Sequence, residues 1–277
     1  MTSNKPKCKY FFGFRAAVFS ISIIIFLLLI AKIKTALIIQ REKRTLSFKN
    51  HNLTMSWMCS GTTNIELVKN LAQAKIISCK RVISAMRTVD RAHFANQHPY
   101  EDAPQCIGFG ATISAPHMHG YALENLNQYL RPGMNALDVG SGSGYLTACM
   151  AEMVGASGHV VGIDHAPGLV SHSKAAMERH YPEWIQNGRV HLVVGDGRKG
   201  YAPMAPYDCI HVGAAAPEEP TDLLSQLKSP GRMFVPVGTS EQYIVVYDKD
   251  TNGNVARRQI MGVRYVPLTD LEKQYSA

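Results

Sequence analysis

The sequence lacks the residue spacings that build metal sites. Its six cysteines include no C-x-x-C pair, and His117 and His119 have no cysteine or acid at ligand spacing. These absences argue against a zinc site and a disulfide framework, so we expect no metal. Cys149 and Cys209 stand in apolar surroundings and are expected to be buried thiols of a reduced, cytosolic-type domain.

Basic charge is also scarce once the first 54 residues are set aside. The chain carries a net charge of +8, but residues 1–54 hold ten of its Lys and Arg against one acid, Glu42. The remaining 19 basic and 20 acidic residues give a sum of −1. The globular part therefore has no electrostatic footprint for DNA or RNA, and we expect no nucleic-acid partner.

Residues 1–54 are expected to form a leader and residues 55–277 the folded domain. The leader contains sixteen uncharged residues, 16–31. A helix of that length spans about 24 Å, short of a hydrocarbon core of about 30 Å, although Arg15 and Lys32 can extend it by snorkelling. Leu29 and Ala31 make a poor cleavage site, which favours a membrane anchor over a signal peptide.

The basic residues that flank this segment predict its orientation. Four precede it and six follow it, so the folded domain is expected in the cytoplasm. The sequon at Asn52 matters only if that side is lumenal. In the alternative, Met55 is an internal start and the usual product has no leader.

Apolar segments alternate with helical patterns through most of the domain. This alternation predicts an α/β fold with a doubly wound, mostly parallel sheet. Strands are expected at 135–139, 159–163, 190–194, 207–212 and 232–237, with a hairpin at 242–248 and 259–265. Helices are expected at 64–75 (with Asn64 as a possible N-cap), 79–88, 119–130, 144–154, 167–180 and 221–228, and residues 91–118 as an ordered loop region.

A glycine-rich loop follows the first of these strands and opens a helix. Its glycines, Gly140, Gly142 and Gly144, let the backbone turn sharply and approach a ligand. A dinucleotide site needs G-x-G-x-x-G, whereas here the third glycine comes one residue early. Asp138 would repel a pyrophosphate but suits the positively charged S-adenosylmethionine. The loop therefore favours a methyl-donor site over a dinucleotide site.

Two more acids end the next two strands. Asp164 is placed to accept hydrogen bonds from ribose hydroxyls, and Asp196 from the adenine amine. A turn or helix N-cap is the competing interpretation of Asp196 in its Asp-Gly pair. Acids at the ends of three successive strands favour the cofactor.

Further segments resemble the signature of the protein-L-isoaspartate O-methyltransferase family, and they specify the acceptor. They are the run from Ile107 to His119, Leu137–Tyr145, Val193–Arg198, Tyr207-Asp208 with His211–Pro217, and Met261–Asp270. The resemblance runs from about Met55 to the C-terminus. It implies a Rossmann-like S-adenosylmethionine methyltransferase core with N- and C-terminal additions.

The resemblance also implies the reaction. A methyl group passes from S-adenosylmethionine to the α-carboxylate of an L-isoaspartyl residue in a damaged protein, and the ester then collapses to a succinimide that can reopen as aspartate. Ser114 is implied as the catalytic serine. The implied cofactor residues, beside the loop with its Ser141, are Ala111, Thr112, Ile113, Ser114, His119, Asp164, His165, Asp196, Gly197, Thr269 and Gln274.

The residues themselves leave alternatives open. From spacing alone Ser114 is equally a turn serine before Ala115-Pro116, and the acceptor is alternatively a small molecule or RNA. A membrane-tethered adaptor that binds S-adenosylmethionine and damaged proteins without turnover is a non-enzyme alternative. The partners expected are isoaspartyl proteins, with a membrane if the leader is present, and the domain is expected to be a monomer. The chain lacks the tryptophan that many relatives have after the glutamine that matches Gln274, which leaves the role of Tyr275 open.

Overall fold

The computed structural model describes residues 59–275. The predicted leader, its anchor at 16–31 and the possible start at Met55 lie outside the described residues. Within residues 59–275, no helix has both the length and the apolar character needed to cross a membrane.

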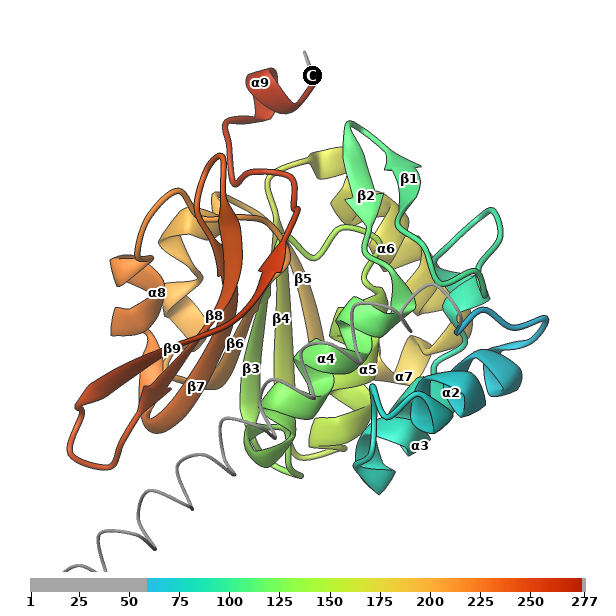
Figure 1. Cartoon of the computed structure of the whole chain (residues 1–277), viewed down its shortest axis with the longest axis horizontal. Helices are drawn as coiled ribbons and strands as arrows, with labels where there is room; N and C mark the ends of the chain where they lie inside the picture. Colours follow the sequence, from blue (N-terminus) through green and yellow to red (C-terminus); the bar gives the residue numbers. More distant parts are fainter. Residues whose placement is uncertain (1–58, 276–277) are drawn as a thin grey trace, which may run out of the picture. The chain divides into compact units, whose positions relative to one another are not determined.

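A seven-stranded sheet forms the centre of the domain (Figure 1). Its order is β5-β4-β3-β6-β7-β8-β9, with β3 to β7 parallel and the last two strands antiparallel. The strands are β3 (Asn135–Val139), β4 (His159–Asp164), β5 (Val190–Val194), β6 (Tyr207–Val212), β7 (Leu227–Val237), β8 (Gln242–Lys249) and β9 (Val255–Val263). The chain order reverses between β3 and β6, which is where ligands bind in such sheets. The doubly wound α/β prediction is confirmed.

Buried side chains on both faces explain why the central strands β3, β4 and β6 are largely apolar. One face packs under helices α2 (Asn64–Gln73), α3 (Lys80–Thr88), α4 (Pro116–Leu126), α5 (Tyr145–Val154), α6 (Pro167–His180) and α7 (Pro182–Gln186). The other face packs under α8 (Thr221–Ser225) and the short turns before β6. Cys149 and Cys209 are fully buried, as predicted.

Helix α2 corrects one detail of the predicted capping. Thr63, not Asn64, is its N-cap, and the Thr63 hydroxyl accepts from the backbone N–H of Glu66. The Asn64 side chain is buried and donates to the carbonyl oxygens of Met86 and Arg87. Asn64 therefore joins α2 to the end of α3 instead of capping its own helix.

The loop region predicted at 91–118 contains regular structure. Strands β1 (Gln105–Gly108) and β2 (Ala111–Ile113) form a separate antiparallel hairpin, and α4 begins at Pro116, three residues before its predicted start. The predicted helix at 221–228 is too long, because Leu227 already belongs to β7. The hairpin predicted at the end of the sheet is confirmed as β8 and β9.

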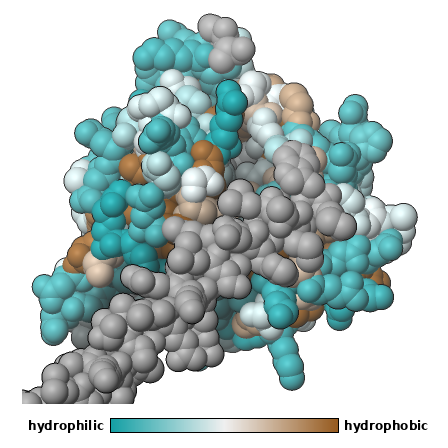
Figure 2. All heavy atoms as spheres, in the orientation of Figure 1, coloured by the Kyte–Doolittle hydropathy of each residue, from teal (hydrophilic) through white to brown (hydrophobic). Residues whose placement is uncertain are grey.

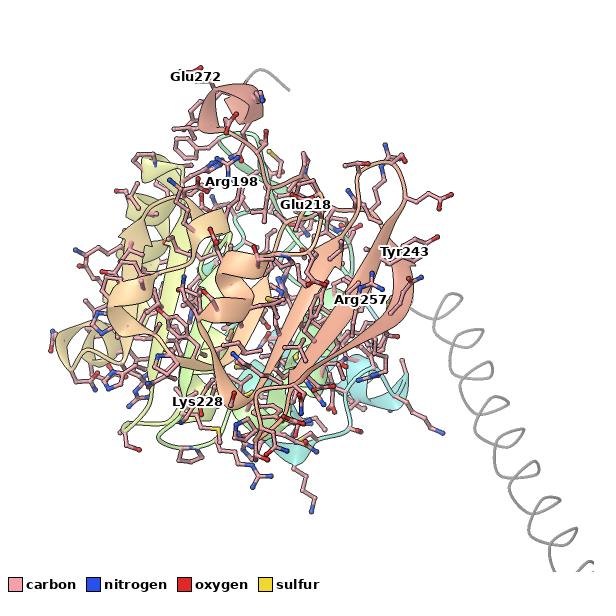
Figure 3. All side chains as sticks on the ribbon, turned by 90° about the vertical axis from the view of Figure 1, so that its left-hand side faces the viewer. Arg198, Glu218, Lys228, Tyr243, Arg257 and Glu272 are labelled. Carbon is pink, nitrogen blue, oxygen red and sulfur yellow. The ribbon has the colours of Figure 1, made fainter. Side chains whose placement is uncertain are left out.

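The final described segment lies at the carboxyl-end side of the parallel strands. Figure 3 shows Glu272 of the last helix, α9 (Leu271–Tyr275), toward the same end of the domain as Arg198, with Lys228 at the opposite end. Where grey atoms do not cover it, the face in Figure 2 is mostly hydrophilic, with hydrophobic residues in small groups. This is the ordinary surface of a folded domain.

Candidate active site

The carboxyl ends of four neighbouring strands bring together the glycine loop and two of the predicted acids. The order β5-β4-β3-β6 places the residues after each strand side by side. Gly140 donates its backbone N–H to the Ile163 carbonyl (2.8 Å), and Gly213 donates to the Val139 carbonyl (2.7 Å). Gly140, Gly142 and Gly144 all have positive φ, as the predicted sharp turn requires.

Two polar groups of this edge retain capacity for a ligand. Asp164 is buried, and its oxygens accept the backbone N–H groups of Ala166 and Gly142, each at 3.0 Å. Its remaining lone pairs are open to hydroxyl donors. The Ser141 hydroxyl is buried without a hydrogen-bond partner among residues 59–275. A buried polar atom of this kind calls for an explanation, and a bound ligand supplies one.

Asp138 is placed differently from the expectation. Asp138 is 1% exposed, and both oxygens of its carboxylate have partners inside the protein. The ring Nδ1 of His211 lies 2.7 Å from Oδ1, and the Thr147 hydroxyl donates to Oδ2 at 2.6 Å. The negative charge lies beneath the loop, but these contacts turn it toward β6 and α5.

Asp196 caps a short turn, which is the competing interpretation of its Asp-Gly pair. It accepts the Arg198 backbone N–H at 3.1 Å and binds the Arg198 guanidinium through both oxygens, at 2.8 and 3.0 Å. The hydrogen bonds from Arg198 hold the pKa of Asp196 below its usual value. Gly197 is buried, and a Cβ there would approach Val139 to 2.6 Å. Glycine therefore lets this turn lie against the end of β3.

The last described residues contact this edge of the sheet through Asp270, Gln274 and Leu268. Arg198 also binds Asp270 at 2.9 Å. The Gln274 side chain accepts from His165 Nε2 (2.7 Å) and donates to the Phe109 carbonyl (2.9 Å). Thr269 lies between Asp270 and Leu268, which donates its N–H to the Ala215 carbonyl. The structure thus brings together Gln274 and His165, two residues that the resemblance implied separately.

The turn of the β1–β2 hairpin fits closely between Gln274 and α6. A Cβ on Gly110 would lie 2.4 Å from the backbone oxygen of Gln274, and Gly110 has φ of +68°. The Phe109 ring covers Gly168, where an added Cβ would be 2.3 Å from the ring. Gly110 therefore allows the hairpin to contact α9, and Gly168 allows it to contact α6.

Ser114 is half-buried at the junction between β2 and α4. Its carbonyl oxygen accepts from the Arg91 guanidinium at 2.8 Å. The adjoining hairpin touches the glycine loop, because a Cβ on Gly142 would lie 3.3 Å from Ile107. Ala111, Thr112 and Ile113 form β2, so the chain passes directly from the predicted cofactor residues to the serine.

Arg91 is fully buried and takes part in none of the ion pairs found in residues 59–275. Its guanidinium lies 3.1 Å from Nδ1 of His119 and 5.2 Å from the centre of the Tyr145 ring. Burial lowers its pKa from the usual 12.5 to about 10. Burial and the neighbouring Arg91 charge keep the pKa of His119 well below its usual value, so that imidazole is neutral. His119 is thus bound to a buried cation, not to an acid.

Sequence reasoning missed three residues of this site: Arg91, His211 and Tyr265. Burial raises the pKa of Tyr265, just beyond β9, to about 12, and the Ser114 side chain partly offsets this shift. His211 lies inside one of the quoted motifs, but its pairing with Asp138 depends on the register of β3 and β6. No spacing pattern marks Arg91, which lies in the region interpreted as a loop.

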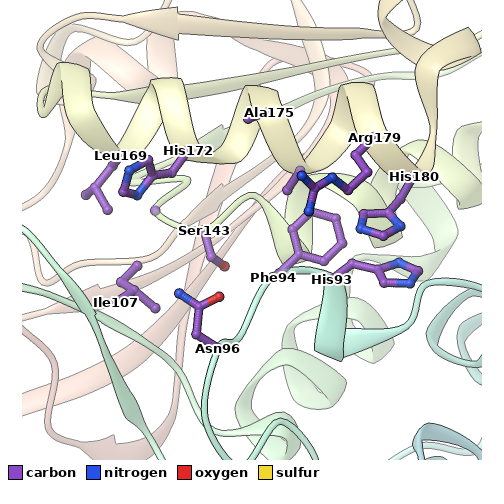
Figure 4. Close-up of a pocket in the computed structure, with 12 residues that line it drawn as sticks. His93, Phe94, Asn96, Ile107, Ser143, Leu169, His172, Ala175, Arg179 and His180 are labelled. Atoms are coloured by element: carbon purple, nitrogen blue, oxygen red, sulfur yellow. The ribbon is translucent and has the colours of Figure 1, made fainter.

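A cavity of about 330 Å³ lies beside the glycine loop, between α6 and the segment around His93 (Figure 4). His93 and His180 stack on each other at one end of it, with their ring centres 3.6 Å apart. Of the residues predicted to hold the cofactor, only Gly142 lines this cavity. The cavity is therefore separate from the acids of the sheet edge.

Known proteins share both the sequence and the architecture of this domain. The family model described as protein-L-isoaspartate(D-aspartate) O-methyltransferase matches residues 62–273. A protein-L-isoaspartate O-methyltransferase from Caenorhabditis elegans is 49% identical over 224 residues, covering 80% of this chain and 99% of that protein. One from Triticum aestivum is 51% identical over 214 residues, covering 76% of this chain and 93% of that protein.

A crystal structure shows the same similarity in three dimensions. The Plasmodium falciparum protein assigned as a protein-L-isoaspartate O-methyltransferase, in complex with S-adenosyl-L-homocysteine, superposes with a TM-score of 0.71 at 32% identity. The match covers 76% of this chain and 99% of that one.

Proposed function

This chain belongs to the protein-L-isoaspartate(D-aspartate) O-methyltransferase family, and from that premise we propose how its residues perform the reaction. The enzyme transfers a methyl group from S-adenosyl-L-methionine to the α-carboxyl group of L-isoaspartyl residues in damaged proteins. What remains to be assigned is the role of each side chain.

The residues of the sheet edge suit this cofactor. When bound, S-adenosylmethionine supplies an electrophilic methyl group on a positively charged sulfur. Asp164 has free lone pairs for ribose hydroxyls, and the unpartnered Ser141 hydroxyl gains a partner. Asp138 contributes its negative charge from beneath the loop, while His165 and Gln274 close the edge from the hairpin side. The remaining members of the proposed cofactor set are Ala111, Thr112, Ile113, Ser114, His119, Gly140, Gly142, Gly144, Asp196, Gly197 and Thr269.

The acceptor chemistry needs orientation more than proton transfer. A carboxylate is already ionised at neutral pH, so its oxygen attacks the methyl carbon without a general base. Ser114 donates one hydrogen bond that orients this carboxylate. Burial of the acceptor strengthens the attack, because water no longer masks its charge. The observation that carries this assignment is the position of Ser114 between the hairpin on the glycine loop and the buried Arg91.

The test compares two peptides that differ only in one linkage. The full chain should methylate an isoaspartyl peptide and ignore its aspartyl twin. Ser114→Ala should lose most of this activity and keep its affinity for S-adenosylmethionine in calorimetry. Equal labelling of both peptides would remove the proposed specificity, and full turnover by Ser114→Ala would remove the serine from the mechanism.

For the leader, we propose that residues 16–31 anchor the enzyme in a membrane and leave residues 55–277 on the cytoplasmic side. Six basic residues follow the uncharged segment and four precede it, which supports this orientation. The domain itself is nearly neutral, so its charge gives it no attraction to a membrane surface. This supports membrane attachment through the leader alone.

Fractionation and glycosylation test the two parts of this proposal. The full chain should remain in membranes after carbonate extraction, whereas a chain that starts at Met55 should not bind them. Asn52 should stay unglycosylated, since its side of the membrane is cytoplasmic. Release by carbonate would contradict the anchor, and a glycosidase-sensitive form would reverse the orientation.

A further inference from the structure

Helix α4, which begins directly after the turn that carries Ser114, has no capping side chain of its own. Its N-cap residue is Ala115, whose methyl side chain cannot accept a hydrogen bond, and Pro116 follows as the first helical residue. Because proline has no N–H, the first backbone N–H of this helix belongs to His117. An N–H at the start of a helix needs an acceptor from outside the helix.

Asp102 supplies that acceptor from the segment before β1. Its Oδ1 accepts the His117 backbone N–H at 3.0 Å, and Nδ1 of the His117 ring lies 2.8 Å from the same oxygen. A carboxylate has no proton to give, so the ring donates. Asp102 is 1% exposed, so water scarcely screens its charge. One buried carboxylate thus caps a helix to which it does not belong.

The Asp102 backbone is itself fixed by residues near the start of the domain. Asp102 donates its N–H to Ser60 Oγ at 3.0 Å, and Gly61 donates to the Tyr100 carbonyl at 2.9 Å. The Ser60 carbonyl in turn accepts from Asn70 of α2 at 2.8 Å. The capping carboxylate is therefore held in place by α2 through this segment.

The turn that carries Ser114 is bound at two points three residues apart. Arg91 donates to the Ser114 carbonyl at 2.8 Å, and Asp102 accepts the N–H of His117. A cation on the carbonyl and an anion on the N–H both form charge-assisted hydrogen bonds, which are stronger than neutral ones. Two such bonds leave this short stretch of backbone little freedom, and orienting a single hydroxyl requires that restriction.

We propose that Asp102 is a positioning residue for methyl transfer: by capping α4 at His117, it holds the Ser114 hydroxyl toward the acceptor carboxylate. Asp102 is buried and acts through the backbone of residues 114–117, without contact with the substrate. The proposal rests on the role proposed above for Ser114.

Two replacements of Asp102 in the full chain test the proposal. With S-adenosylmethionine and an isoaspartyl peptide, Asp102→Asn should lower kcat about three- to tenfold, because it keeps the shape but exchanges charge-assisted bonds for neutral ones. Asp102→Ala removes the acceptor and should lower kcat about ten- to a hundredfold, the range for a catalytic group displaced by up to about 1 Å. The Kd for S-adenosylmethionine should not change, because Asp164 and the glycine loop lie on other elements.

Asp208→Asn is the matched control. Asp208 is also buried, and it also binds a backbone N–H (of Asn135, 2.8 Å) and a basic side chain (of Lys228, 2.8 Å). Figure 3 shows Lys228 at the end of the domain opposite to the site. Asp208→Asn should therefore lower the free energy of unfolding in urea about as much as Asp102→Asn, but leave kcat unchanged. If Asp102→Ala does not fold, Asp102→Asn and this control decide the question.

A double-mutant cycle connects Asp102 to the serine. In a Ser114→Ala background, Asp102→Asn should have no further effect on the residual kcat. A fully active Ser114→Ala enzyme overturns the role of the serine, and the present proposal with it. If Ser114→Ala loses most of its activity, the Asp102 proposal alone is overturned by full kcat of Asp102→Asn, by an equal loss of kcat in Asp208→Asn, or by additive effects in the cycle.

Discussion

Replacing Arg91 by methionine should lower the activity of the enzyme much more than its stability. Methionine keeps an unbranched apolar stem but removes a guanidinium that is fully buried and has no acidic partner within the described residues. The change of its pKa from 12.5 to about 10 corresponds to a penalty of about 3 kcal/mol on the charged form. Methionine removes that penalty.

The same substitution leaves two groups without a donor. The Ser114 carbonyl and the His119 ring each lose a hydrogen bond, at a cost of about 1–3 kcal/mol apiece. Because gain and loss nearly cancel, we expect the free energy of unfolding to change by less than about 2 kcal/mol. Removing one partner of a buried ion pair would instead cost about 3–5 kcal/mol.

Activity should respond more strongly than stability. Without Arg91 the Ser114 backbone is free to move, so kcat should fall about tenfold or more. Urea unfolding followed by circular dichroism gives the stability, and methylation of an isoaspartyl peptide gives kcat. Arg189→Met is the control, since Arg189 lies over Trp184, at 5.4 Å from the ring centre, and away from the serine.

Two results would refute this reasoning. A loss of stability well above about 4 kcal/mol would show that the buried cation holds the fold together. An unchanged kcat would show that the Ser114 carbonyl needs no donor.

Three further predictions concern the cofactor edge. Gly110→Ala should weaken S-adenosylmethionine binding severalfold in calorimetry, because the added Cβ meets the Gln274 backbone. Gly108→Ala is the control: it has similar backbone strain, but no atom lies within 4 Å of its added Cβ, so it should bind normally. Burial raises the pKa of Asp164, so this carboxylate should become protonated at a higher pH than an ordinary aspartate. Cofactor affinity should therefore be lost as the pH falls through that raised pKa. Asp164→Asn should bind the cofactor weakly and without this pH dependence. Asp138→Asn should lower the free energy of unfolding by about 2–3 kcal/mol in denaturant titrations, since it removes the charge that faces a buried histidine.

The sequence allowed the sheet to be predicted because its central strands, β3, β4 and β6, are buried on both faces. The segments 135–139 and 207–212 are each followed by glycine, and both match strands residue for residue. The β1–β2 hairpin was not predicted, because its strands are four and three residues long and mix buried with exposed positions. The helix at 221–228 was predicted too long, since Leu227 is equally apolar in a helix or a strand.

The positions of the site residues were easier to predict than their partners. Asp138, Asp164 and Asp196 lie at or just beyond the ends of successive strands, as spacing predicted. Spacing does not show which atoms already have partners, so the contacts of Asp138 with His211 and of Asp196 with Arg198 were not foreseen. Such contacts join residues more than 70 positions apart or depend on a local turn, and neither leaves a periodic signal.

The contact between Phe109 and Gly168 restricts how the two positions can vary among relatives. Position 168 lies in the first turn of α6, where alanine is favoured over glycine by about 1 kcal/mol, yet a methyl group there would meet the ring at 2.3 Å. The Phe109 ring, 59 positions away in the sequence, thus disfavours alanine at position 168. We expect the two positions to coevolve, with alanine at 168 found where 109 has lost its aromatic ring.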